Sequence, residues 1–130
     1  MVSFEFSSPK DLKKQYEVFG NFYNVLHAGS TKRYRNDLHI IDKDYIEAYG
    51  LTTQIELLVI MMNPGGSSPV SHTHIIDNYT KEMITMRDHC SNLIPTMPDN
   101  TQYQVMRMMK GLQIKHTRVI EIRYLCEKQT

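Results

Sequence analysis

The sequence is poor in cysteine and in net charge, and it contains no long apolar run. Its two cysteines, Cys90 and Cys126, are far apart and form no Cys-x-x-Cys pair, which is typical of reduced thiols in a cytosol. The 15 basic and 14 acidic residues leave a formal charge of +1. This balance gives no electrostatic case for a strong binder of duplex DNA. The cysteine pattern leads us to expect a cytoplasmic protein.

No segment indicates a membrane or a secretory route. The longest apolar run, Leu57 to Met62, is far shorter than the roughly 20 residues of a membrane span. The first residues lack a basic start followed by an apolar stretch, so we expect no signal peptide. The chain has 130 residues, of which 41% are hydrophobic and 22% charged. These values predict one globular domain, residues 1–130, that buries a core without disulfides.

The first half of the chain predicts a helix and a hairpin. Ser8-Pro9-Lys10-Asp11 has the features of a helix start, with a capping box and a proline at the first helical position. We expect this helix to end at Gly20. Residues 22–27 and 32–41 flank a turn of small residues, which is typical of a β-hairpin. Residues 44–49 predict one or two helical turns that end at Gly50.

The second half predicts a strand, two helices and a closing strand. Residues 54–62 are almost continuously apolar, which predicts a strand covered on both faces. Residues 75–93 have helical spacing, and residues 99–101 offer caps for a further helix. Residues 118–125 predict a last strand. We expect it to lie parallel to the apolar strand at residues 54–62, joined to it by a right-handed crossover. We expect an α/β fold, a small three-layer sandwich with a mixed, partly parallel sheet and an N-terminal β-hairpin.

The loop after the apolar strand carries the strongest functional signal. Its residues are Asn63, Pro64, Gly65, Gly66, Ser67 and Ser68. α/β proteins place ligands at the carboxyl ends of parallel strands. Backbone N–H groups of Gly65 to Ser68 can form an anion-binding nest, and the Asn63 carboxamide can donate and accept hydrogen bonds. The alternative is a structural turn between a strand and a helix.

The segment LLVIMMNPGGSSP resembles the first motif of the mismatch-specific uracil/thymine branch of the uracil-DNA glycosylase superfamily. The matching residues are Asn63, Pro64, Gly65, Ser67 and Ser68. In that branch the asparagine positions the attacking water, so the resemblance implies a catalytic role for Asn63. Met61 stands where the branch has a glycine, and the branch's second motif has no counterpart before Thr130.

Residues 32–125 are also similar to a bacterial and phage family that is classed as a domain of unknown function. The family pattern has an Arg-Tyr pair, matched by Arg33-Tyr34, and an apolar strand that ends in Asn-Pro. An Asp-x-Thr helix start follows, matched by Asp99 and Thr101. Glu121-Ile122 occupies the place of the family's Asn-Leu, and family members usually continue further. The family implies no established activity, but these residues are candidates for its site.

Two further groups of residues are candidates for ligand contact. His72 and His74 follow the Asn63 loop and could make polar contacts with its ligand, or could belong to a solvated linker. They lack further ligands at metal spacing, so we expect no metal and no cofactor. Arg33 and Tyr34 could bind phosphate or stack on a base. Their alternative is an exposed hairpin arm with a charged edge.

Three functions are consistent with these signals. The first is binding of a phosphate-containing ligand, a nucleotide or single-stranded nucleic acid, through the Asn63–Ser68 loop. The second is a non-catalytic interaction or sequestering protein, of the kind that phages encode, which we expect to form a homo-oligomer. The third is a glycosidase of the uracil-DNA glycosylase type, with Asn63 orienting the water. Whether the chain is an enzyme is left open.

Overall fold

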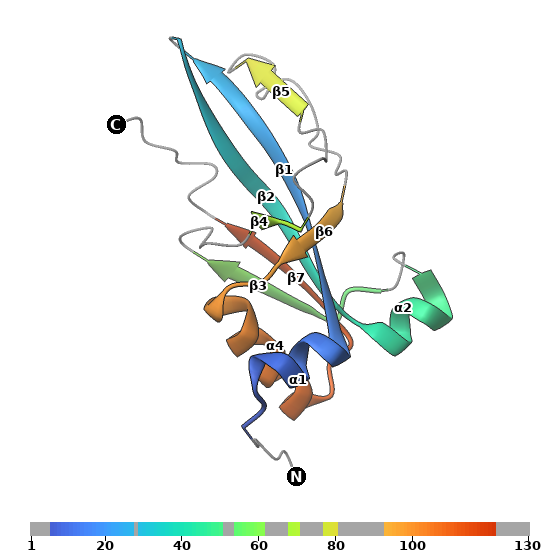
Figure 1. The fold of residues 1–130 in the computed structure, drawn as a ribbon. Helices are drawn as coiled ribbons and strands as arrows, with labels where there is room; N and C mark the ends of the chain where they lie inside the picture. The colour runs from blue at the N-terminus through green and yellow to red at the C-terminus, as the bar shows by residue number, and fades with distance from the viewer. Residues whose placement is uncertain are drawn as a thin grey trace.

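The computed structural model describes residues 6–27, 29–50, 54–61, 68–70, 77–80 and 93–121. Its elements, shown in Figure 1, are α1 (Pro9–Gln15), β1 (Tyr16–His27), β2 (Ser30–Asp42), α2 (Lys43–Tyr49), β3 (Leu57–Met61), β4 (Ser68–Pro69), β5 (Asp77–Thr80), β6 (Ile94–Met97), α4 (Asn100–Leu112) and β7 (His116–Glu121). The predicted α/β class is confirmed. None of the described helices has the length and apolarity that crossing a membrane requires.

The strands form one mixed sheet in the order β3-β7-β2-β1-β6-β4, with β5 paired to β1. β1 and β2 make a long antiparallel hairpin at the N-terminal side of the chain. β3 runs parallel to β7, and β5 runs parallel to β1. The N-terminal hairpin and the partly parallel sheet are therefore as predicted. The predicted parallel pairing of the apolar strand, β3, with the closing strand, β7, is also confirmed.

Two helices cover one face of the sheet, which we call the helix face. Leu12 of α1 and Met106 and Met109 of α4 pack there on buried residues of the central strands. The strand residues of this core cluster are Tyr16, Val18, Leu38, Ile40 and Val119. Because side chains alternate along a strand, their sequence neighbours point to the opposite side, which we call the second face. The described helices that close the core thus form one layer against the sheet.

Local sequence signals set the helix ends. The side chain of Asp99 accepts hydrogen bonds from Thr101 N and Gln102 N, and the Gln102 side-chain oxygen accepts one from Asp99 N, which completes a capping box at α4. Asp42 caps α2 in the same way, and α2 ends at Gly50 with a φ of 74°. A positive φ of this kind favours glycine. The predicted helix start at residues 99–101 and the stop at Gly50 are confirmed.

Two predicted helices differ from the structure. α1 ends at Gln15 rather than Gly20, because residues from Tyr16 onward pair with β2. Gly20 lies inside β1, where a Cβ atom would lie 2.9 Å from the Thr96 hydroxyl. The helix predicted for residues 75–93 is wrong at β5, whose backbone pairs with Tyr23–Leu26. Long-range strand pairing outweighs the helical spacing there, and residues 81–92 lie outside the described part.

The expectation that the apolar strand is buried on both faces is wrong. Leu58 and Ile60 of β3 are 51% and 57% exposed, and their neighbours Val59 and Met61 pack on the core. The reason is that α1 and α4 cover only the helix face, whereas Leu58 and Ile60 point to the second face. One face of β3 therefore packs on the core, and its other face is apolar and exposed.

Candidate functional site

Much of the predicted loop site lies outside the described residues. This holds for Asn63, Pro64, Gly65, Gly66 and Ser67, and for His72 and His74. Ser68 is described, and it is an exposed residue of β4. The predictions for the other residues of the loop stay predictions. The structure does describe where this loop begins and ends.

The two ends of the loop lie beside other predicted site residues. The loop follows Met61, the last residue of β3, and it closes at Ser68, which pairs with Met97 of β6. Met97 is two residues before Asp99, the N-cap of α4. α4 connects to the start of β7 through a short turn, so its N-terminus lies toward the carboxyl ends of β7 and β3. The structure therefore brings Ser68 and Asp99 to one end of the sheet.

Arg33 and Tyr34 lie toward the same end. Their backbones belong to β2 and pair with Asn24 and Tyr23 of β1. Among the described residues, β2 pairs with β7 from Leu38 to Ile41, and Figure 1 shows the hairpin extending past the arrowheads of β3 and β7. The two residues thus lie beyond the carboxyl end of β7, on the hairpin arm.

Asp99 and Thr101 occupy the first turn of α4, but the local charge there does not suit an anion. The Asp99 carboxylate already accepts the N–H groups of Thr101 and Gln102, at 3.0 and 3.2 Å. A helix N-terminus attracts anions through such free N–H groups, and here a carboxylate occupies them. If Asp99 contacts a ligand, the contacting group is therefore a hydrogen-bond donor such as a hydroxyl.

A polar array on the second face was not predicted. Asp37 and His39 lie two residues apart on β2, and His116 and Arg118 lie two apart on β7. Since His39 pairs directly with Arg118 and Ile41 with His116, all four polar side chains point to the same side. We call these four residues the polar array.

Hydrogen bonds connect the array into one line. Arg118 Nε donates to Asp37 Oδ1 at 2.9 Å, and His39 Nε2 lies 3.3 Å from the same oxygen. Burial by itself raises the pKa of Asp37, but hydrogen bonds and charges of His39 and Arg118 outweigh it and lower that pKa. Asp37 is therefore ionised at neutral pH, and its carboxylate holds the Arg118 guanidinium and the His39 ring in place.

The two histidines of the array contact each other. His39 Nδ1 lies 2.8 Å from His116 Nε2, and the His116 residue is 1% exposed. A contact this short between imidazole nitrogens requires one N–H and one bare nitrogen. His39 therefore connects the buried carboxylate of Asp37 to a buried imidazole, and both of its ring nitrogens are engaged.

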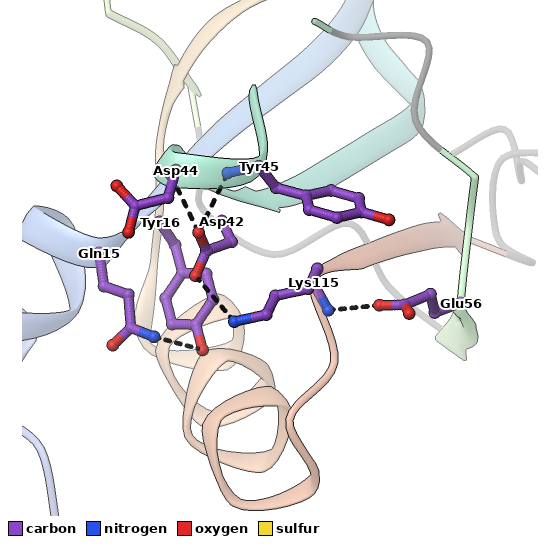
Figure 2. A network of polar contacts seen from close by, with 7 residues as sticks. All are labelled: Gln15, Tyr16, Asp42, Asp44, Tyr45, Glu56 and Lys115. Carbon is purple, nitrogen blue, oxygen red and sulfur yellow. Dashed lines mark hydrogen bonds and ion pairs between the residues drawn. The ribbon is translucent and has the colours of Figure 1, made fainter. Parts of the chain in front are cut away.

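Figure 2 shows the network that fixes the start of β7, where His116 lies. Asp42 N donates to Lys115 O at 2.8 Å, and the Asp42 carboxylate lies 3.7 Å from Lys115 Nζ. Glu56 accepts from Lys115 N and donates its own N–H to His116 O at 2.9 Å. Burial, and then the charge of Asp42, raise the pKa of Tyr16 to about 12. The contacts of Asp42, Lys115 and Glu56 tie the end of β2 and the residue before β3 to the start of β7.

Arg118 is the member of the array that can meet a ligand. Its side chain is 43% exposed, and its two terminal nitrogens bond to none of the described residues. A guanidinium whose Nε is held by a carboxylate presents its terminal N–H groups in a fixed direction, which suits phosphate or carboxylate oxygens. The described residues include no group of three or more side chains arranged to hold a metal ion.

No local pattern in the sequence indicates that His39 and His116 meet, because 77 residues separate them. The local signal that could have found the array is alternation. The segments Asp37-Leu38-His39 and His116-Thr117-Arg118 each place two polar side chains on one face of a strand. Only the antiparallel pairing of β2 with β7 shows that these two faces meet.

Comparisons of this chain with protein-family models, with curated proteins and with solved structures give no match. The two family resemblances of the sequence therefore stay predictions.

Proposed function

We propose that this chain is a cytoplasmic domain that binds a phosphate-containing ligand of nucleotide type at the carboxyl end of β3. The observation that carries the proposal is the exposed guanidinium of Arg118, oriented by buried Asp37. The sequence of the Asn63–Ser68 loop supports it from the other side, since glycine and serine backbones suit an anion. The widely spaced cysteines support a reducing compartment.

The pairing of β3 with β7 shows how far Arg118 lies from the carboxyl end of β3. Arg118 lies opposite Leu58, three residues before β3 ends at Met61, which is about 10 Å along a strand. Arg118 points to the second face, whereas α4 and its Asp99 cap lie on the helix face. We therefore assign the phosphate to Arg118 and the loop, and a sugar hydroxyl to Asp99.

Substitution of Arg118 tests this assignment. We expect Arg118→Ala to weaken the binding of a nucleotide by about tenfold, because it removes a charge-assisted, two-pronged contact. Arg118→Lys should recover part of the loss, since lysine keeps the charge without the fork. The measurement is calorimetric titration with inorganic phosphate and a panel of nucleoside mono- and triphosphates.

Lys43→Ala is the matched control, because it removes a cation at the start of α2, four residues along the chain from His39, which pairs with Arg118. Its nucleotide affinity should equal that of the wild type. Absence of heat from every phosphate compound, with folded wild-type protein, would contradict the proposed function. An unchanged affinity in Arg118→Ala would instead contradict the role of Arg118 alone.

A non-catalytic interaction protein that forms a homo-oligomer is a second candidate, and one observation favours it. β3 ends the sheet order, and its exposed Leu58 and Ile60 form an apolar strip along that edge. Edge strands of this kind pair with other chains unless they are protected. No described residue bears on the glycosidase hypothesis, which stays a prediction resting on Asn63.

Charged substitutions on β3 test self-association. If the strip joins two copies, Leu58→Lys and Ile60→Lys should each convert a dimer to a monomer, since a buried unpaired charge is costly at an interface. Light scattering at several protein concentrations measures this. A wild-type protein that is monomeric at every concentration would count against the homo-oligomer.

A further inference from the structure

The outer surface of the helical layer carries an excess of cations. α1 contributes Lys10, Lys13 and Lys14, and α4 contributes Arg107 and Lys110. Asp11 is the single acidic residue within these two helices, although the whole chain has a formal charge of only +1. With five basic residues and one acidic residue, the two helices together carry a formal charge of 5 − 1 = +4.

Contacts near the N-terminus join the cations of the two helices. Arg107 Nε donates to Ser7 O at 2.9 Å, and Lys110 Nζ donates to Ser7 Oγ at 2.9 Å. Ser7 immediately precedes Ser8, which caps α1. Lys10 follows three residues after Ser7, so the cations of α4 lie beside the first turn of α1.

Lys10 and Lys14 face away from the core. Leu12 is the buried residue of α1, and positions two before and two after it lie on the opposite side of a helix. Both lysines are exposed, and their spacing of four residues places them one turn apart with like charges, which destabilises an isolated helix. A strip of cations thus runs from the outer side of α1 to Arg107 and Lys110.

An exposed aromatic ring lies within this strip. Phe6 is 79% exposed, and Arg107 Cζ lies 4.7 Å from the centroid of its ring. One face of the ring contacts the guanidinium, so the rest of the ring is open to solvent. A basic track with an exposed aromatic ring is the combination that binds single-stranded nucleic acid, through phosphate contacts and base stacking.

We propose that Phe6, Lys10, Lys14, Arg107 and Lys110 form a binding surface for single-stranded nucleic acid. The exposed ring favours a nucleic acid over an acidic protein, because stacking on a base uses Phe6 and a carboxylate does not. The near-zero charge of the whole chain favours a single strand over a duplex. This surface lies on the outer side of the helix layer, away from Arg118, and it does not rest on the proposed function.

Fluorescence anisotropy with a labelled 20-nucleotide oligothymidylate and with oligouridylate tests the proposal. We expect the binding constant to fall as salt rises, with a log–log slope of about −2 to −3, because each phosphate contact in a single strand contributes about −0.7. Lys10→Gln combined with Lys14→Gln should weaken binding about tenfold and reduce the slope by about 1.4. Phe6→Ala should weaken binding about tenfold with an unchanged slope, since it removes stacking and no charge.

Lys43→Gln, which removes one positive charge from α2, is the control and should leave the affinity unchanged. Absence of binding by the folded wild-type protein would overturn the proposal, as would an oligonucleotide affinity indifferent to Lys10 and Lys14. Equal displacement of the oligonucleotide by polyglutamate, together with no effect of Phe6→Ala, would identify an acidic protein as the partner and also overturn it.

Discussion

Replacing Asp37 by asparagine is expected to lower the free energy of unfolding by about 2 kcal/mol. Asp37 is buried and serves both Arg118 and His39. Removing one partner of a buried charge pair typically costs about 3–5 kcal/mol, because the other charge is left buried. Here the Arg118 side chain is 43% exposed, and water can solvate it, so we expect a smaller loss. Urea denaturation of the variant measures it.

The pH dependence of this loss has a definite sign. Because the folded state lowers the pKa of Asp37, ionised Asp37 stabilises the fold fully above its unfolded pKa of about 3.9. That stability is lost as the pH falls through the lower, folded pKa. The difference between wild type and Asp37→Asn should therefore be constant from about pH 5 to 7 and shrink below about pH 4.

Glu47→Gln supplies the control for this measurement. Glu47 is an exposed carboxylate of α2, and a surface substitution of this kind changes stability by less than about 0.5 kcal/mol. A loss of stability in Asp37→Asn that persists unchanged at pH 3 would show that packing, and not the charge of Asp37, causes it. If Asp37→Asn and Glu47→Gln change the free energy of unfolding equally, the claim that the buried contacts of Asp37 stabilise the fold is contradicted.

The Asp37 variant also connects stability to the proposed ligand site. Asp37 holds Arg118 Nε, and without that anchor the guanidinium gains rotational freedom and loses its fixed direction. Ordering a long side chain on binding costs about 0.5–1.5 kcal/mol, so the variant should bind phosphate less tightly even where it is fully folded. The same carboxylate thus stabilises the sheet and orients its exposed cation.

Local signals in the sequence predicted the parts of the fold that depend on local chemistry. The Asp99 cap, the stop at Gly50 and the hairpin turn follow from residues within a few positions of each other. The parallel pairing of β3 and β7 was also predictable, because a strand, a helix and a strand in sequence favour that crossover.

The predictions that were wrong concern features that depend on long-range contacts. The helical spacing of residues 75–93 could not show that Asp77–Thr80 would pair with β1. The apolar run of β3 could not show that the described helices cover only one face, leaving Leu58 and Ile60 exposed. Of the predicted site residues, Ser68 and Asp99 lie toward one end of the sheet, and their role in a site stays a prediction. The contact between Asp37 and Arg118 was not predicted from the sequence, because 81 residues separate the two.

Replacing His39 or His116 by leucine should each cost about 2 kcal/mol of unfolding free energy. Each change removes one nitrogen of the 2.8 Å contact and leaves the facing nitrogen without that partner, a loss of about 1–3 kcal/mol. His39→Leu also removes the contact with Asp37, so its loss should lie toward the upper end of that range. The double variant His39→Leu, His116→Leu should be less unstable than the sum of the singles, because the second change removes the orphaned nitrogen. We expect a coupling energy of about 1 kcal/mol in this double-mutant cycle.

A cycle of His39→Leu with Glu47→Gln is the control and should be additive, since the two residues belong to separate parts of the structure and share no contact. Nitrogen-15 spectra of the wild-type imidazoles at neutral pH give an independent reading. One of the two facing nitrogens should carry a hydrogen and the other should not. If the losses of unfolding free energy in the two histidine variants simply add, the contact between the rings contributes nothing to stability. The array would then orient Arg118 through Asp37 alone, and His116 would simply fill space at the start of β7, where Lys115 and Glu56 already fix the backbone.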